Sequence, residues 1–546
     1  MKCLLVLLSI VMALPAFAGF QMTTEEKLAD FDQLNSQIEA HYGPKFYKKE
    51  SIRLDLPALR ALYREEIAES KTNVEFYHAM VRFVAAFKDG HFNISIPTDT
   101  SVSLPILTDL VGGKVLIDSV DRAKLPVADF PFDRGDEVVA VDGEPVDITL
   151  NELSKYLYSG RDISIRRKAA MSVFVRTGKL FPMPENSKVS ISVRRGTSDL
   201  VETATLEWKK TGTPIDETTR PMNRVLFMNG IGPIKDYKML SSKETWVELL
   251  GDERLERFYQ CSGTTRVAIP KDATVLIRDP FVAYYHPTAK GNVGYLRIPH
   301  YLPPAKPGSA EPDYEGYFRR YEWVVSELEK NTVGLVIDQD HNCGGSVDYL
   351  HKIVSLFMST PFQPMQFELR ASKTEYLDYT NWIKTSSTPD TIEFKNAMIV
   401  RDLILKTWKA GDFLTPKTSI DGETAIAPNP VHYTKPIVML IDEMSGSGGD
   451  AFPSLMQGLG RATLIGVATS GLGGHVNQMP SLNNSGMVIR MTQSLFYRPD
   501  GVAVENNGAV PDIDYSPTRD DFMYEYKNYQ QFYLKALLSK IDSEIK

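Results

Sequence analysis

Hydrophobic positions in the first part of the chain recur with the period of an α-helix. Between residues 23 and 87, apolar side chains return every three or four positions. The clearest series is Val74, Tyr77, Val81, Val84 and Phe87. Thr72 and Glu75 before this series have the spacing of a capping box, a helix-start signal. The pattern predicts a helical N-terminal region over residues 19–100, in which His91 directly follows the end of the last helix.

Residues 101–210 change to short strand-like runs that are separated by turns. Residues 133–146 contain alternating apolar positions on either side of Asp142-Gly143, a dipeptide typical of tight hairpin turns. The pattern predicts a small β domain over residues 101–210.

The second half of the chain predicts an α/β domain. Residues 211–290 combine proline, glycine and charge without a sustained period, which indicates an irregular insert. Apolar runs then appear at residues 292–298, 334–338 and 436–442, with a helical pattern between the first two. Buried strands that alternate with helices are typical of a parallel sheet covered by helices. The sequence therefore predicts an α/β core over residues 291–546.

The N-terminus has the pattern of a secretory signal peptide. Lys2 precedes a short apolar stretch, and Ala16-Phe17-Ala18 forms a small-x-small cleavage site before Gly19. A membrane anchor would need about 18 apolar residues, and Pro15 interrupts this stretch earlier. We therefore expect a signal peptide over residues 1–18, an exported chain that is periplasmic or secreted, and no membrane span.

Composition excludes one class of partner and leaves the thiol state open. The chain has 61 Lys and Arg against 69 Asp and Glu, a net charge of −8, and no run of five basic residues. Nucleic acid is therefore not an expected partner. The chain remaining after signal-peptide removal carries Cys261 and Cys343. A disulfide between these two cysteines and two free thiols are each compatible with export.

The segment with the most chemical information follows the apolar run that ends at residue 442. Gly446-Ser447-Gly448 forms a glycine-rich turn, and a helix-like run begins after it. Such a turn exposes a hydroxyl at a helix N-terminus, where free N–H groups favour a developing oxyanion. An ordinary turn or helix cap is the plainer interpretation, and the segment alone does not decide between the two.

A second strand leads into a Gly344-Gly345 turn. Two parallel strands that end in such turns place backbone N–H groups side by side, so the amide of Gly344 or Gly345 could join that of Gly448 in an oxyanion hole. Of these we expect the amides of Gly344 and Gly448 to bind the oxyanion. Phosphate binding is the alternative, but the chain lacks the glycine-lysine-serine/threonine signature of such a loop. It also lacks the motifs of a catalytic metal site, so no metal and no cofactor are expected.

Several blocks together resemble one protease family. In chain order they read FKDGHF, VGYLRIP, GLVIDQDHNCGGS, IVMLIDEMSGSGGDAF, GRATLIGVATSGLGG and VENNGAVPDI. Their order and type are similar to those of the tail-specific (carboxyl-terminal-processing) serine proteases, in the branch of the chlamydial protease-like activity factor and the tricorn protease. Residues 133–146 resemble the hairpin of a PDZ domain, which binds peptides as an added strand. The resemblance implies a crotonase-like α/β core with a helical N-terminal region and a PDZ-like β domain.

The resemblance also implies a Ser-His-Glu triad. The family nucleophile falls on Ser447. Many members use a lysine about 25 residues later as the base, but Leu472 stands there and no lysine occurs before Lys527. The other branch uses a histidine and a glutamate, which fall on His91 and Glu505. A neutral imidazole held by a carboxylate can take the serine proton.

Two other histidines and two other functions remain open. His341 and His475, each beside a glycine turn, are rivals for the base. The interpretation as an exported serine endopeptidase that acts on proteins or peptides competes with a non-catalytic peptide-binding scaffold of the same fold. A lipid- or retinoid-binding relative is a weaker alternative. By the same resemblance, residues 211–290 are a candidate inhibitory segment, and a homodimer is a further expectation.

Overall fold

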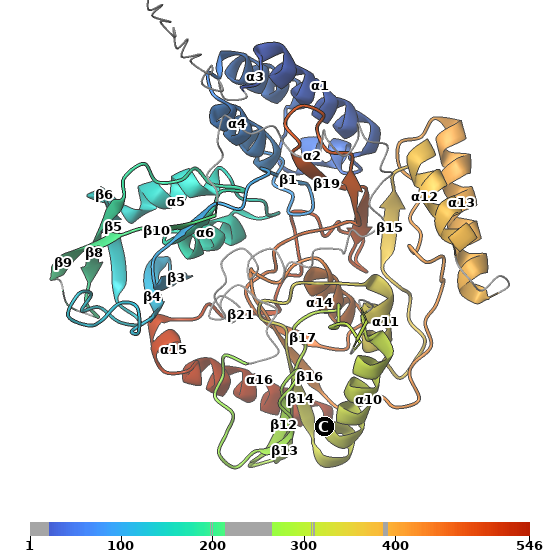
Figure 1. Ribbon diagram of the computed structural model, residues 1–546. Helices are drawn as coiled ribbons and strands as arrows, with labels where there is room; N and C mark the ends of the chain where they lie inside the picture. Colours follow the sequence, from blue (N-terminus) through green and yellow to red (C-terminus); the bar gives the residue numbers. More distant parts are fainter. Residues whose placement is uncertain are drawn as a thin grey trace, which may run out of the picture.

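The computed structural model describes residues 21–212, 265–385 and 391–545, apart from positions 197, 199, 307, 310 and 311. The N-terminal helices lie together at the top of Figure 1, a β domain lies beside them, and a larger sheet with helices fills the lower part. The expected signal peptide over residues 1–18 lies outside the described residues. So does most of the expected insert.

Four helices begin the described chain. They are α1 (Thr24–His41), α2 (Lys45–Ser51), α3 (Leu56–Glu69) and α4 (Asn73–Ala85). The expected capping box at the start of α4 is present, with Thr72 and Glu75 each bonding the other's backbone. The helical prediction for this part of the chain is thus confirmed.

The N-terminal helices are attached to the C-terminal part of the chain. The strand β1 (Asn93–Ser95), just after His91, pairs antiparallel with β19 (Val488–Thr492), which also pairs with β18 (Val476–Met479). On α1, the buried Asp30 accepts hydrogen bonds from the backbone N–H groups of Asn484 and Ser485 at 2.9 and 2.7 Å. His91 is thereby held on a surface that is almost 400 residues away along the chain.

The next region is an antiparallel β domain with two helices. Its main sheet joins β3 (Ile106–Val111), β4 (Lys114–Val120), β5 (Glu137–Val141), β8 (Lys188–Arg194) and β9 (Val201–Glu207), and β6 (Glu144–Pro145) pairs with β5. A smaller sheet has the order β10 (Lys209–Thr211), β2 (Ser101–Ser103) and β7 (Val175–Thr177). Between the strands lie α5 (Val146–Ser154) and α6 (Asp162–Met171).

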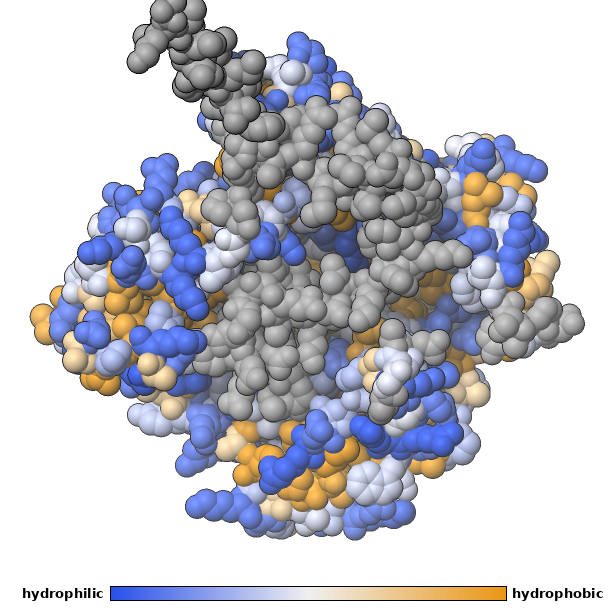
Figure 2. All heavy atoms as spheres, in the orientation of Figure 1, coloured by the Kyte–Doolittle hydropathy of each residue, from blue (hydrophilic) through white to orange (hydrophobic). Residues whose placement is uncertain are grey.

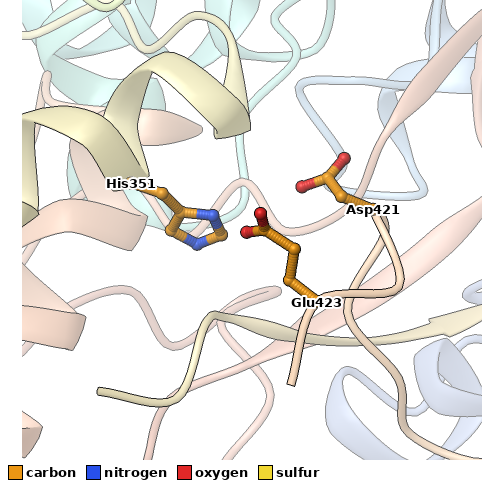
Figure 3. Close-up of side chains that lie close together, drawn as sticks. All are labelled: His351, Asp421 and Glu423. Carbon is orange, nitrogen blue, oxygen red and sulfur yellow. The ribbon is translucent and has the colours of Figure 1, made fainter. Parts of the chain in front are cut away.

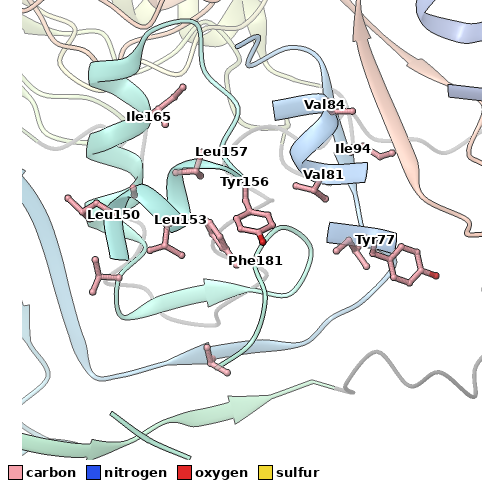
Figure 4. Packing of buried hydrophobic residues seen from close by; sticks show 14 of the residues in the cluster. Tyr77, Val81, Val84, Ile94, Leu150, Leu153, Tyr156, Leu157, Ile165 and Phe181 are labelled. Atoms are coloured by element: carbon pink, nitrogen blue, oxygen red, sulfur yellow. The ribbon is translucent and has the colours of Figure 1, made fainter. Parts of the chain in front are cut away.

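The β domain and the N-terminal helices share one hydrophobic core. Figure 4 shows Tyr77, Val81 and Val84 of α4 near side chains of the β domain, among them Tyr156 and Phe181. These residues belong to one continuous buried cluster, so the two regions pack as a unit.

A seven-stranded sheet forms the centre of the remaining chain. Its order is β11 (Thr274–Ile277), β12 (Ala283–Thr288), β13 (Gly291–Arg297), β14 (Gly334–Asp338), β16 (Ile437–Ile441), β17 (Thr463–Gly466) and β21 (Ile513–Asp514). Pairing is parallel from β13 to β21 and antiparallel at β11 and β12. The sheet therefore extends upstream of residue 291, because two short edge strands continue it within the expected insert.

Helices cover both faces of this sheet. Leu335 and Ile337 pack in one cluster with α10 (Tyr314–Asn331), α11 (Val347–Ser355) and α14 (Gly448–Gly458). Val336, between them, points to the opposite face and packs in a cluster with α16 (Lys527–Ile545), which follows the short helix α15 (Arg519–Met523). This alternation is the reason for the unbroken apolar run of β14.

A helical hairpin projects from the right side of Figure 1. It consists of α12 (Lys373–Thr385) and α13 (Ile392–Ala410), next to the two-stranded pair of β15 (Gln366–Leu369) and β20 (Ser494–Tyr497). The face drawn in Figure 2 is largely hydrophilic, with scattered hydrophobic patches. None of the helices in the described part combines the length and the apolar character that a membrane crossing requires.

Candidate active site

Ser447 lies at the carboxyl end of the central sheet in an unusual backbone conformation. It directly precedes α14 and has φ 59° and ψ −114°. A residue with a β-carbon reaches this left-handed region at a cost of about 1–3 kcal/mol, and it stays there only where its surroundings impose it. Ser447 is half-buried, whereas Ser445 in the same turn is fully buried. Of these two serines, only Ser447 is partly exposed.

Asp450 holds the turn in place. Its Oδ2 accepts hydrogen bonds from the N–H groups of Ser447 at 2.7 Å and Leu472 at 2.9 Å. Its Oδ1 accepts from the N–H of Gly471 at 2.8 Å and from the hydroxyl of Thr469. Burial raises the pKa of this carboxyl to about 6, although these hydrogen bonds oppose the shift. Asp450 thus ties the serine turn to the segment 469–472.

A second set of contacts joins the serine turn to the end of β14. Ser445 Oγ lies 2.7 Å from the carbonyl oxygen of Gln339 and 2.9 Å from Asp442 Oδ1. The N–H of Gly446 donates to the carbonyl oxygen of Asn342 at 2.9 Å. The two strand ends that the sequence indicated therefore lie side by side.

Three glycines meet next to Ser447. The N–H of Gly344 donates to Asn342 Oδ1 at 2.8 Å, so this amide is already engaged. Within the described chain, the N–H groups of Gly345 and Gly448 have no acceptor. Gly344 is still essential to the geometry, because a β-carbon there would lie 2.7 Å from both Gly448 N and Ser447 Cβ.

His91 is held by the carboxylate of Asp89. Asp89 Oδ1 accepts from the N–H groups of His91 at 2.8 Å and Phe92 at 3.1 Å. Its Oδ2 accepts from the hydroxyls of Tyr42 at 2.9 Å and Thr492 at 2.8 Å. The imidazole is half-buried, and its Nδ1 is buried with no hydrogen-bond partner among the residues described. Burial lowers the pKa of His91 to about 4, so its ring is a neutral base at neutral pH.

Glu505 is fully buried and bonded on both oxygens. Oε2 accepts the N–H of Gly473 at 2.7 Å, and Oε1 pairs with the ammonium of Lys48. Burial and the neighbouring Asp89 raise the pKa of Glu505 to about 8, whereas Lys48 and the Gly473 bond act in the opposite direction.

The three predicted site residues surround one segment, 469–474. The side chain of Leu472 lies against Gly90 and Gly446, the residues just before His91 and Ser447. The neighbouring glycines contact two of the predicted residues: the N–H of Gly473 donates to Glu505, and the backbone of Gly474 lies near the His91 ring. In this structure His91 is hydrogen-bonded to neither Ser447 nor Glu505. Folding has thus brought the three turns together without forming the bonds of a triad.

The rival histidines have other partners. The imidazole of His341 pairs with Asp442, and burial lowers its pKa to about 4. His475 lies 3.0 Å from Glu375 through Nε2 and 2.9 Å from the hydroxyl of Ser494 through Nδ1. Through these contacts both histidines have a structural role beside the site.

Arg167 forms a buried ionic cluster that sequence analysis missed. It belongs to α6 and donates two hydrogen bonds of 2.8 Å to Asp109 on β3. It also contacts Asp442 at 3.3 Å and Glu443 at 3.1 Å, directly before the serine turn. The β domain is thereby attached to the strand end that carries the candidate nucleophile.

One described cluster has the residue types of a metal site. His351, Asp421 and Glu423 have ligand atoms within 4.8 Å of one another (Figure 3). The N–H of Met365, however, donates to His351 Nε2 at 3.2 Å. A neutral imidazole that accepts on Nε2 carries its proton on Nδ1, whereas a ligating histidine donates from its second nitrogen. With Nε2 engaged by Met365 and the proton on Nδ1, His351 has no free lone pair for a metal ion, and the cluster supports no metal assignment.

The structure describes the state of one of the two remaining cysteines. Cys343 takes part in a disulfide, whereas Cys261 lies outside the described residues.

A cavity of about 480 Å³ lies beside Asn506, and its lining includes Tyr47, Lys88 and Arg161 but neither Ser447 nor His91.

Comparison with known proteins assigns two domains. Residues 292–515 match the model of peptidase family S41, and residues 100–218 match that of a PDZ domain. A Chlamydia pneumoniae protein is 26% identical over 92% of this chain and 88% of its own length. A carboxy-terminal-processing protease of Bartonella bacilliformis is 34% identical, over 14% of this chain and 18% of its own.

A solved structure of mature CPAF complexed with lactacystin shares the fold. Its TM-score is 0.77 at 22% identity, and the match covers 95% of this chain and 99% of that one. The predicted fold class is confirmed: an α/β catalytic core, an N-terminal helical region and a PDZ-like β domain. The predicted resemblance to this protease family is confirmed as well.

Two matched glycine variants test whether space beside Ser447 is required. Gly344 and Gly411 both have left-handed backbones, with φ 76° and 86°, but a β-carbon at Gly411 would meet nothing within 4 Å. In both alanine variants the left-handed backbone conformation costs roughly 1–2 kcal/mol of stability. Only Gly344→Ala also displaces the serine turn, so we expect at least about tenfold slower labelling by a fluorophosphonate probe, a loss of about 1.4 kcal/mol in transition-state stabilisation. Equal labelling rates of the two folded variants would contradict this account.

Proposed function

Because residues 292–515 form a peptidase family S41 domain and the chain is a serine-type peptidase, we propose that it hydrolyses peptide bonds through Ser447, His91 and Glu505. The observation that carries the proposal is the strained backbone of Ser447 at the N-terminus of α14, near the Gly345 and Gly448 amides, which have no acceptor among the described residues. An accessible hydroxyl next to free N–H donors is the arrangement that acyl transfer needs.

Each residue has a defined role in the proposed reaction. Ser447 Oγ attacks the scissile carbonyl while the imidazole of His91 takes its proton, and the same proton later goes to the leaving amine. The oxyanion is bound by the amide of Gly448 and by that of the Gly344-Gly345 turn, where the Gly345 N–H has no acceptor within the described part of the chain. Water then cleaves the acyl-enzyme. Glu505 fixes the imidazole and stabilises its positive form.

The proposed triad requires a rearrangement at the segment 469–474. Leu472 lies against the turns of both His91 and Ser447, and the backbone of Gly474 lies near the His91 ring. A shift of this segment would free the imidazole to reach the serine on one side and the glutamate on the other. Catalytic hydrogen bonds often tighten only when substrate is bound, which agrees with such a step.

Substrate class and location form part of the same proposal. We propose that the chain acts as an endopeptidase on proteins or peptides and that the PDZ domain binds extended segments of them.

The N-terminal pattern supports export with removal of residues 1–18. N-terminal sequencing of the chain recovered outside the cytoplasm should then begin at Gly19, and an intact Met1 terminus there would contradict removal.

Two serine-to-alanine variants, one directly before α14 and one within it, test the nucleophile. Ser447→Ala removes the attacking hydroxyl, and we expect casein and fluorogenic-peptide turnover to fall by about a thousandfold or more, as for other triad serines. Ser454 on α14 is the control, because its buried hydroxyl has no hydrogen-bond partner in the described chain. Ser454→Ala should keep wild-type turnover and fluorophosphonate labelling. Undiminished turnover in Ser447→Ala would refute the assignment, and a wild-type protein that never labels would favour a non-catalytic scaffold.

A further inference from the structure

Lys48 is a lysine with no exposed surface in the middle of the candidate site. Its side chain comes from α2 and is 0% exposed. The ammonium donates to Lys88 O at 2.9 Å, to Asn506 Oδ1 at 2.9 Å and to Glu505 Oε1. These acceptors use all three N–H groups that a lysine carries. Fully buried lysines are rare. Because Lys48 has no contact with solvent, its role lies in the contacts that its ammonium makes.

The acceptors of Lys48 belong to the two turns that carry His91 and Glu505. Lys88 lies three residues before His91, and Asn506 follows Glu505. Asn506 Nδ2 also donates to Lys88 O, at 2.9 Å. The ammonium therefore connects the histidine turn to the glutamate turn, over 400 residues apart in the chain.

The surroundings of Glu505 would otherwise favour its neutral form. Burial and the negative charge of Asp89 both raise its pKa. Tyr42, and Tyr47 with its hydroxyl 2.7 Å from Glu505 O, also face this group. Among these neighbours from α1, α2 and the Asp89 turn, Lys48 is the cation that opposes the shift. A buried carboxylate without a paired charge is neutralised rather than kept ionised.

We propose that Lys48 is a positioning residue for catalysis, which favours the ionised form of Glu505 and orients its carboxylate toward His91. This inference rests on the proposed function, because Lys48 acts through Glu505 and touches neither substrate nor the reacting atoms. A purely structural tie between the two turns is the competing explanation. The two differ in what they predict for the pH profile.

The test compares kcat/KM against pH in wild type, Lys48→Met, Lys48→Arg and Lys27→Met. In wild type we expect kcat/KM to rise with pH as Glu505 ionises, with a midpoint near its raised pKa of about 8. Lys48→Met removes the cation, so the midpoint should move to higher pH. For each pH unit by which the midpoint moves, kcat/KM at neutral pH should fall about tenfold, with KM little changed. Lys48→Arg keeps the charge and should restore much of the wild-type profile.

Lys27 provides the matched control. It lies on α1, is 1% exposed, and donates to the backbone carbonyls of Ser70 at 2.9 Å and Thr72 at 3.2 Å. Lys27→Met also removes a buried ammonium, but not one beside Glu505, so it should lower thermal stability without moving the pH midpoint. An unchanged midpoint in folded Lys48→Met, or the same displacement of the midpoint in Lys27→Met, would overturn the inference.

Glu505→Gln separates this inference from the triad proposal. If Glu505→Gln keeps full kcat/KM, the triad itself is wrong. If it is inactive while Lys48→Met follows the wild-type profile, only the role of Lys48 is wrong. The double variant Lys48→Met/Glu505→Gln removes both buried charges and guards against misfolding caused by a lone carboxylate. Its kcat/KM should equal that of Glu505→Gln, and a further loss would contradict action through Glu505.

Discussion

The left-handed backbone of Ser447 is the constraint on which the site depends. A serine takes this conformation only if other contacts fix the turn, and here they come from both directions. Asp450 binds the Ser447 N–H from inside α14, and Ser445 anchors the turn to the end of β14. Parallel pairing of β14 with β16 brings the two strand ends together, so the strain is supported by the sheet itself.

The same constraint explains why distant parts of the chain must meet. A hydroxyl at a helix N-terminus is not reactive without a base, and the base that we propose, His91, comes from the N-terminal region. That region is held on the C-terminal part by β1 pairing with β19 and by Asp30. The segment 469–474 then lies between all three site turns. In this structure the imidazole is hydrogen-bonded to neither Ser447 nor Glu505, so the proposed triad requires a shift in this region.

Much of the fold and part of the site could be predicted from local sequence. The capping box at Thr72, the apolar run of β14 and the glycine turns depend on neighbouring residues, so their pattern is visible in the chain. The assignments of His91 and Glu505 came from a family resemblance and stay predictions. Lys48, Asp89, Asp450 and Arg167 were missed, because their partners are fixed only by tertiary packing. For the same reason the sequence could not reveal that Asn342 already engages the Gly344 amide, which leaves Gly345 as the unengaged donor of that turn.

A crystal structure of the full chain labelled with a fluorophosphonate tests the central claim most directly. The account predicts a single adduct on Ser447 Oγ, with the phosphonyl oxygen at the Gly345 and Gly448 amides. It further predicts the His91 imidazole turned from Gly474 toward Ser447 and within hydrogen-bond reach of Glu505. An adduct on another serine, or a Ser447 adduct with the His91 ring out of reach of both Ser447 and Glu505, would contradict it.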